Sequence, residues 1–247
     1  MKRQRIDKLL VEQGLADSRT KAQALIMSGV VLVNEQKVLK PSQEFLPTEI
    51  IRLKGNSEET KYVGRGGLKL EKALSEFQIC PNEYVCLDVG ASTGGFTDCL
   101  LQNGAKKVVT IDVGTNQLVW KLRNDERVEA RENINARYLK PEDFNEKFNL
   151  IVMDVSFISV TKILPALKDL LVENGKIIVL IKPQFEVGKG EVGKGGIVKD
   201  EVKHAEVVEK IHLFADEIGL KNKGLIDSPI LGANGNKEFL ALYERAE

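Results

Sequence analysis

The sequence has few of the residues that build disulfide frameworks or metal sites. Its 247 residues include three cysteines and two histidines. Cys80, Cys86 and Cys99 are odd in number and lack the spacing of metal ligands. This argues against a disulfide-rich secreted domain and indicates a reduced, cytoplasmic protein. His204 and His212 form no H-E-x-x-H pattern, so we expect no metal ion.

Long apolar runs are also missing. The longest candidate, residues 150–160, is interrupted by Asp154 and Ser156, and it is shorter than the roughly 18 residues that a membrane helix needs. The chain begins with charged residues and has no apolar segment near its start. The sequence therefore predicts neither a membrane span nor a signal peptide.

The formal net charge is zero, but the charge is unevenly distributed. Residues 1–65 hold 12 Lys and Arg against 8 Asp and Glu, whereas residues 66–247 hold 24 against 28. A short basic region followed by a longer, mildly acidic one suggests that the first part of the chain binds a polyanion.

The first part reads as a small α+β domain over residues 1–60. Apolar spacing predicts helices over residues 5–13 and 19–27, and β-rich runs predict strands over 30–33 and 49–53. Residues 54–67 contain four glycines and little to bury. We interpret this stretch as the interdomain connection, with 61–67 as the linker and 68–247 as the second domain.

From residue 68 onward, predicted helices and strands alternate. We expect helices over 68–77, 95–102, 160–171 and 201–218, a short one near 117–122, and strands over 84–89, 107–112, 128–131, 148–154, 176–181, 224–230 and 238–243. This alternation predicts an α/β fold with a doubly wound, mostly parallel sheet. The last two strands are joined by a short turn, so we expect an antiparallel pair at the end of the chain.

A glycine-rich loop follows the first of these strands. It reads Asp-Val-Gly-Ala-Ser-Thr-Gly-Gly-Phe over residues 88–96. Ser92 stands where a dinucleotide loop has its second glycine, and no Gly-Lys-Ser/Thr of a P-loop follows. S-adenosylmethionine is a cation without phosphates, and an acid beside the loop suits its ammonium group. The candidate cofactor-binding residues of the loop are Asp88, Gly90, Ala91, Ser92, Gly94, Gly95 and Phe96.

Two polar residues farther along support a nucleoside-containing cofactor. Asp112 ends the next predicted strand, where an acid can accept hydrogen bonds from both ribose hydroxyls. Asn133 follows the third strand, where it would contact adenine. We include both among the candidate cofactor-binding residues.

The order Lys69, Asp88-x-Gly90, Asp112, Asp154, Lys182, Glu238 resembles the FtsJ-like 2'-O-methyltransferases with their Lys-Asp-Lys-Glu tetrad. With its first domain included, the chain resembles the TlyA (haemolysin A) family, which joins a ribosomal-protein-S-four-type RNA-binding domain to such a methyltransferase. The matching stretches cover essentially the whole chain and lie at residues 62–70, 88–96, 154–159, 182–186 and 235–240.

This resemblance implies a Rossmann-like methyltransferase sheet and S-adenosylmethionine as the cofactor. It implies 2'-O-methylation of ribose in RNA, with cytidine in ribosomal RNA as the target and ribosomal RNA or subunits as partners. The implied catalytic residues are Lys69, Asp154, Lys182 and Glu238.

Methyl transfer to a hydroxyl explains why two lysines and two carboxylates would be needed at this site. Asp154 and Lys182 end predicted strands, at the edge where open α/β sheets bind ligands. A ribose hydroxyl must lose its proton as it attacks a methyl group. A lysine takes that proton only if its pKa falls from about 10.4 toward 7, which burial and a second cation favour. We interpret one lysine as the base, with Lys182 the first candidate, and the two acids as groups that orient the lysines.

Basic residues outside the tetrad are candidates for RNA binding. Five of them cluster around the two helices of the first domain, one lies in the predicted linker, and two lie in a Gly/Lys loop that either follows RNA or is a plain surface loop. They are Arg3, Arg5, Lys8, Arg19, Lys21, Arg65, Lys189 and Lys194.

Three other functions remain open from the sequence. One is a membrane-active haemolysin, which the family label suggests and the missing apolar helix disfavours. The others are an RNA-binding protein with a non-catalytic methyltransferase fold and a base methyltransferase, which would leave the two lysines unexplained. We interpret Trp120 and the phenylalanines as packing residues and not as base-stacking platforms.

Overall fold

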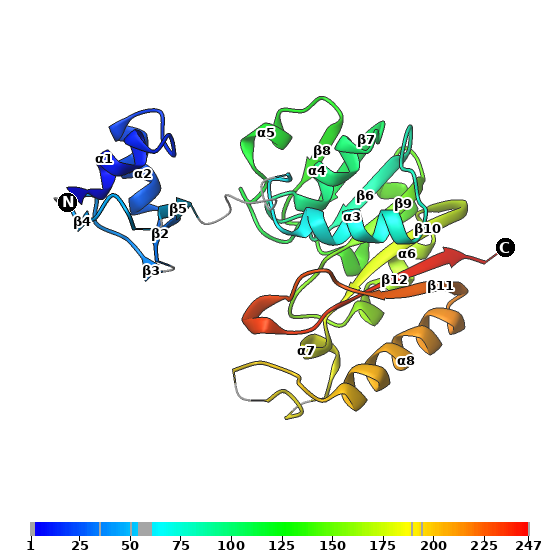
Figure 1. Cartoon of the computed structure of the whole chain (residues 1–247). Helices are drawn as coiled ribbons and strands as arrows, with labels where there is room; N and C mark the ends of the chain where they lie inside the picture. Colours follow the sequence, from blue (N-terminus) through cyan, green and yellow to red (C-terminus); the bar gives the residue numbers. More distant parts are fainter. Residues whose placement is uncertain are drawn as a thin grey trace. The chain divides into compact units, whose positions relative to one another are not determined.

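The computed structural model describes residues 3–34, 36–49, 51–53, 61–188, 190–193 and 195–246. The chain divides into two compact units, Met1–Lys61 and Tyr62–Glu247, and Figure 1 shows the elements of each. The candidate RNA-binding residues Lys189 and Lys194 lie outside the described residues.

The first unit packs two short helices on small antiparallel sheets. Helices α1 (Ile6–Glu12) and α2 (Arg19–Met27) lie beside β2 (Val31–Val33), which pairs with β3 (Gln36–Lys37) and β5 (Ile51–Leu53), while β1 (Gln4–Arg5) pairs with β4 (Glu44–Phe45). The Ser18 side chain caps α2 by accepting a hydrogen bond from the Lys21 backbone N–H. The core of this unit consists of Ile6, Leu10, Ala16, Ala22, Ile26, Val31, Val33 and Val38.

The second unit is built on a seven-stranded sheet in the order β11-β12-β10-β9-β6-β7-β8. Its strands are β6 (Val85–Val89), β7 (Lys107–Ile111), β8 (Val128–Arg131), β9 (Phe148–Met153), β10 (Leu171–Ile181), β11 (Leu220–Asp227) and β12 (Phe239–Arg245). Strands β6 to β10 are parallel, and β12 runs antiparallel to both β10 and β11. The predicted doubly wound, mostly parallel sheet is confirmed.

Helices cover both faces of this sheet (Figure 1). They are α3 (Gly66–Glu76), α4 (Gly95–Gln102), α5 (Trp120–Arg123), α6 (Leu164–Lys168), α7 (Pro183–Glu186) and α8 (Glu201–Glu217), with 3-10 turns η2 (Ala136–Tyr138), η3 (Pro141–Asp143), η4 (Val160–Lys162) and η5 (Ala233–Gly235). Along β6, Cys86 packs with the cluster that contains α3 and α4, while Leu87 packs with the cluster that contains α6 and α8. Alternate side chains of one strand thus enter two cores.

The predicted helix over residues 160–171 is wrong at its end. The chain forms η4 and the short helix α6, and β10 already begins at Leu171. Asn174 takes a positive φ of 57°, and the register with β9 shifts between Leu171 and Lys176. The apolar residues of this segment satisfy the spacing of a helix as well as that of a strand, so periodicity alone did not separate the two.

The interpretation of residues 61–67 as a linker is also wrong. Tyr62 is 4% exposed, the Val63 backbone N–H donates a hydrogen bond to Asp98 Oδ2 at 2.9 Å, and α3 begins at Gly66. A Cβ on Gly67 would overlap the Tyr62 ring. These glycines therefore allow close packing at the start of α3, and the second unit begins at Tyr62 and not at residue 68.

Candidate active site

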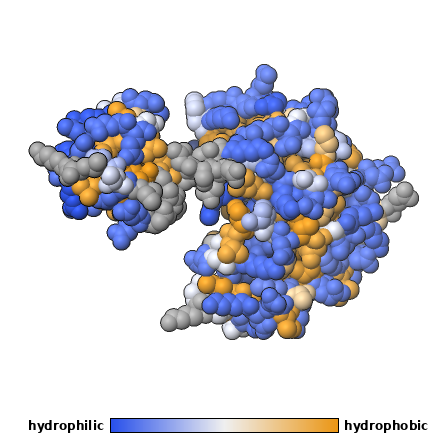
Figure 2. Space-filling model, viewed as in Figure 1, coloured by the Kyte–Doolittle hydropathy of each residue, from blue (hydrophilic) through white to orange (hydrophobic). Residues whose placement is uncertain are grey.

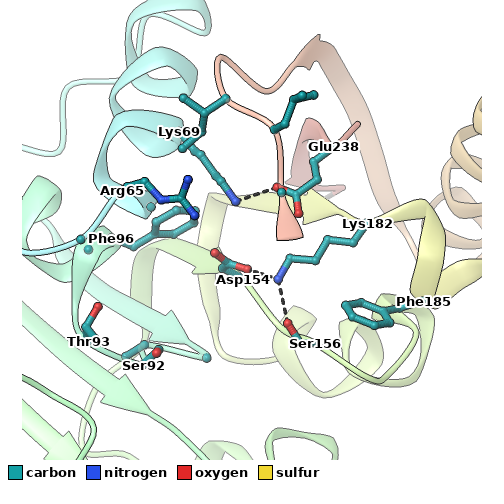
Figure 3. Close-up of a pocket in the computed structure, with 18 of the residues that line it drawn as sticks. Arg65, Lys69, Ser92, Thr93, Phe96, Asp154, Ser156, Lys182, Phe185 and Glu238 are labelled. Atoms are coloured by element: carbon teal, nitrogen blue, oxygen red, sulfur yellow. Dashed lines mark hydrogen bonds and ion pairs between the residues drawn. The ribbon is translucent and has the colours of Figure 1, made fainter. Parts of the chain in front are cut away.

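Four charged residues from distant parts of the chain meet at one edge of the sheet. Asp154 follows β9 and Lys182 follows β10, so both lie at the carboxyl ends of adjacent parallel strands. Because β12 is antiparallel to β10, with Ile181 paired to Phe239, Glu238 comes to the same edge. Lys69 extends from α3 toward Glu238 (Figure 3).

The four residues form two ion pairs. Lys69 Nζ lies 2.6 Å from Glu238 Oε2, with side chains 10% and 2% exposed. Lys182 Nζ forms an ion pair with Asp154 Oδ1 at 2.6 Å, with side chains 11% and 22% exposed, and donates a hydrogen bond to Ser156 Oγ at 2.9 Å. Pairing makes two cations tolerable at partly buried positions.

These pairs line a cavity of about 380 Å³, which we call the tetrad cavity. Its wall also contains Arg65, Phe96, Phe157 and Phe185. The cavity therefore combines two lysines, two carboxylates, a third cation and several aromatic rings, as Figure 3 shows.

A second cavity of about 410 Å³ opens beside the first, and we call it the Asp112 cavity. The two cavities share the wall residues Gly90, Ser92, Asp154, Ser156 and Phe157. A molecule in the Asp112 cavity would therefore border the tetrad across this shared wall. The remaining lining of the Asp112 cavity includes the apolar residues Val89, Ile111, Val113, Ile134, Ala136, Val155, Ile158 and Ile163.

The glycine-rich loop runs between the two cavities. Gly90 has a φ of 85°, and a Cβ at this position would overlap the Asp154 carbonyl oxygen. Only glycine accommodates both constraints. Asp112 holds the loop from the other side, since Oδ2 accepts from the Ser92 N–H at 2.8 Å and Oδ1 from the Gly114 N–H at 2.7 Å.

Asp88 occupies a different place from the one expected of a ligand-binding acid. It is fully buried and lines neither cavity. Its Oδ2 accepts a hydrogen bond from Thr97 Oγ1 at 2.6 Å, which joins β6 to the first turn of α4. Burial, together with the charge of Asp154, raises the pKa of Asp88 to about 7. Asp88 therefore stabilises the glycine-rich loop by joining the strand before it to the helix after it.

The other predicted cofactor residues divide into two groups. Gly90, Ala91, Ser92, Gly95, Phe96 and Asp112 line one or both cavities. Gly94 faces the Leu118 and Leu122 side chains instead, and Asn133 lines neither cavity. The residues after it, Ile134, Asn135 and Ala136, line the Asp112 cavity in its place.

The candidate RNA-binding residues of the first unit are not equivalent. Arg5 and Arg19 each donate a 2.9 Å hydrogen bond to Oδ2 of the buried Asp7, and Gln23 donates a third at 3.0 Å. The arginine pair holds the pKa of Asp7 well below its usual range. The other cations are less constrained: Arg3 and Lys8 are exposed, and Lys21 pairs with the exposed Asp17.

The sequence analysis missed several cavity residues, above all Phe157. This side chain is 90% exposed, its backbone has a φ of 64°, and it borders both cavities. Its ring centroid lies 5.0 Å from that of Phe185. The interpretation of the phenylalanines as packing residues is therefore wrong for Phe157. The available signal was its place three residues after Asp154, at the end of a strand.

Among the described residues, no group of three or more His, Cys, Asp or Glu side chains could hold a metal ion. No helix in the described part of the chain is long and apolar enough to cross a membrane. The visible face of the second unit is mostly hydrophilic, with apolar patches between (Figure 2).

Comparison with known families and proteins agrees with this geometry. The FtsJ-like methyltransferase model matches residues 62–245, and the S4 domain model matches residues 4–51. The chain is 46% identical over 240 residues to "Hemolysin A" of Brachyspira hyodysenteriae, covering 97% of this chain and 99% of that protein.

Two further relatives match this chain over most of their own length. The "16S/23S rRNA (cytidine-2'-O)-methyltransferase TlyA" of Mycobacterium tuberculosis is 44% identical over 238 residues, covering 96% of this chain and 88% of that protein. A solved structure, "Putative hemolysin from Streptococcus thermophilus", has a TM-score of 0.77 and 46% identity, and covers 100% of this chain and 90% of that chain. With an S4 domain followed by the methyltransferase fold, this chain belongs to the FtsJ-like methyltransferases, in the TlyA (hemolysin A) group.

Proposed function

We propose that this protein transfers a methyl group from S-adenosylmethionine to the ribose 2'-hydroxyl of a cytidine in ribosomal RNA. The observation that carries the proposal is the convergence of Lys69, Asp154, Lys182 and Glu238 on one cavity that shares its wall with the Asp112 cavity. The nucleotide and the ribosomal RNA come from the names of relatives.

The Asp112 cavity fits S-adenosylmethionine in its chemistry. Asp112 suits the ribose hydroxyls, and the apolar side chains around Ile134 and Ile163 suit the adenine ring. Gly90 lets the loop pass close to the Asp154 backbone, which brings the loop and the tetrad to one shared wall. Bound there, the cofactor would supply an electrophilic methyl group on a sulfonium.

The side chains of the tetrad cavity would prepare the hydroxyl. Asp154 and Ser156 fix the Lys182 side-chain nitrogen at the shared wall. Once this nitrogen has released its own third proton to solvent, the neutral amine can orient the 2'-hydroxyl and receive its proton as the oxygen attacks. Lys69, paired with Glu238, contributes a positive charge that stabilises the developing alkoxide.

The remaining parts of the chain would bind the RNA. In the first unit, Arg3 and Lys8 present exposed cations to phosphates. Arg65 lines the tetrad cavity and would contact the substrate backbone. A ribosomal RNA substrate implies that the enzyme works in the cytoplasm.

Mapping of 2'-O-methyl groups tests the function. Ribosomal RNA from cells with and without this gene is compared position by position, and from deletion cells that carry the Lys182→Ala variant. We expect one or a few cytidine 2'-O-methyl groups to be lost without the gene and to stay absent with the variant. Identical maps in all three strains would contradict the proposal.

A further inference from the structure

A buried glutamate joins the two segments that carry Asp154 and Lys182. Glu186, the last residue of α7, is 6% exposed. Its Oε2 accepts a hydrogen bond from Ser159 Oγ at 2.6 Å. Its Oε1 accepts a hydrogen bond from the Val160 backbone N–H at 2.8 Å. One carboxylate thus closes a bridge from the turn after β10 to the segment after β9.

The bridge connects the two segments whose relative position sets the distance between Asp154 and Lys182. Lys182 directly precedes α7, and Glu186 lies one turn later on this helix. Asp154, Ser156 and Phe157 belong to the segment that ends at Ser159. Between Asp154 and Ser159 the described chain forms no helix or strand. The ladder between β9 and β10 ends at Met153 and Val179. The Asp154 N–H still bonds to the Val89 carbonyl oxygen at 3.0 Å, so strand pairing holds the start of this segment but not the residues after it.

Burial of the Glu186 carboxylate has a desolvation cost in free energy. Burial raises the pKa of the Glu186 carboxyl, because desolvation disfavours the charged form. Among the described side chains, no cation lies within ion-pair distance of Glu186. The charge of Lys210 acts on Glu186 without forming an ion pair, so a hydroxyl and one backbone N–H are the hydrogen-bond donors that compensate for the burial of this carboxylate.

We propose that Glu186 is a positioning residue that clamps the Asp154–Phe157 segment to the Lys182 turn and so sets the geometry of the Asp154–Lys182 pair. This inference rests on the proposed function for its activity readout. The clamp itself can be observed without activity, through exchange of the backbone amides that it protects.

The variants separate hydrogen bonding from charge. Glu186→Ala removes both bonds. Glu186→Gln keeps an oxygen for the Val160 N–H and offers an amide to Ser159 Oγ. Asn149→Ala serves as the matched control, because the Asn149 side chain accepts from the Val85 backbone N–H at 2.9 Å at the opposite end of the sheet.

Hydrogen–deuterium exchange of the full chain is the first readout. We expect Glu186→Ala to raise exchange across residues 154–162, and Glu186→Gln and Asn149→Ala to leave it near wild type. Unchanged exchange in Glu186→Ala would overturn the clamp. This result is independent of whether the protein methylates RNA, so it distinguishes a failed clamp from a failed function.

Methyl transfer to ribosomal RNA is the second readout. A misplacement of about 1 Å can cost about 100-fold in rate. We expect Glu186→Ala to lower kcat by roughly 10- to 100-fold, with little change in the KM for RNA or in S-adenosylmethionine affinity. Glu186→Gln should recover most of kcat, and Asn149→Ala should keep it. An unchanged kcat in Glu186→Ala, or a Glu186→Gln as slow as Glu186→Ala, would overturn the positioning role.

Discussion

Lys69 Nζ and Glu238 Oε2 lie 2.6 Å apart although the two residues are 169 positions apart in the sequence. The pair forms because α3 packs beside the sheet edge at which β12 begins. Both side chains are nearly buried, so each depends on the other to compensate for lost hydration.

This dependence gives a prediction on stability. Glu238→Leu alone should lower the free energy of unfolding by about 3–5 kcal/mol, because it leaves Lys69 as a buried unpaired cation. The double variant Lys69→Met/Glu238→Leu should recover most of the loss and remain inactive. Denaturant unfolding and methyl-transfer assays measure the two effects. A double variant less stable than Glu238→Leu would contradict the account.

The Asp112 cavity gives a prediction on cofactor affinity. Asp112→Ala should weaken binding of S-adenosylmethionine strongly, since it removes the proposed ribose acceptor and frees the Ser92 and Gly114 N–H groups. Asn133→Ala is the control and should bind normally, because Asn133 lines neither cavity. Calorimetry provides both constants. Equal affinities in the two variants would place the cofactor elsewhere.

The buried Asp88 predicts a pH dependence of stability. Its folded pKa of about 7 exceeds the unfolded value of about 3.9. Between these values the unfolded chain binds fewer protons than the folded chain, so stability falls as pH rises from about 4 to 7 and then levels off. The loss is at most roughly 4 kcal/mol.

The Asp88→Asn variant isolates this contribution, because its carboxamide does not titrate. Unfolding free energies are compared at pH 5 and pH 8 for both proteins. We expect wild type to lose more stability than Asp88→Asn over this interval. Parallel pH profiles would show that the folded Asp88 titrates at an ordinary pKa.

The exposed ring of Phe157 gives a prediction on substrate binding. A left-handed backbone and a solvent-facing ring at a cavity mouth are both unfavourable, and together they mark a surface for a planar apolar partner such as a base. Stacking is worth about 1–3 kcal/mol per base. Phe157→Ala should therefore lower kcat/KM for RNA by roughly 5- to 150-fold, while Phe157→Trp should retain most of it. Equal effects of both variants would exclude stacking.

Much of the fold follows from local signals. The alternating apolar runs predicted the sheet, and charges at strand ends drew attention to Asp154 and Lys182. Those signals come from residues that are neighbours in the sequence. No such local pattern indicates that α3 approaches the start of β12, so the Lys69–Glu238 contact could be expected only from the resemblance.

The differences between these expectations and the structure have physical causes of the same kind. Glycines near residue 64 allow close helix packing as well as flexibility, and the sequence does not say which applies. Asp88 and Asn133 stand beside the expected site in sequence, but neither residue lines the tetrad cavity or the Asp112 cavity. Arg5 and Arg19 are basic, yet the buried Asp7 holds both, a contact across 12 residues for Arg19.

Lys182 is the residue on which the proposed chemistry depends most. General-base catalysis contributes about 10²–10⁴-fold. Lys182→Ala should lose about that factor while binding S-adenosylmethionine nearly normally. Lys182→Arg should be about as slow, because a guanidinium keeps the charge but does not release its proton near neutral pH. An active Lys182→Arg would make this residue an electrostatic clamp and leave the base to Lys69 or water.

The most direct test follows a labelled methyl group. Ribosomal RNA or subunits are incubated with S-adenosylmethionine carrying an isotopic methyl label and either wild type or Lys182→Ala, and the nucleosides are separated by mass spectrometry. We expect the label in 2'-O-methylcytidine with wild type, and a reduction by about 10²–10⁴-fold with the variant. Label in a base-methylated nucleoside, or equal incorporation by both proteins, would contradict the account.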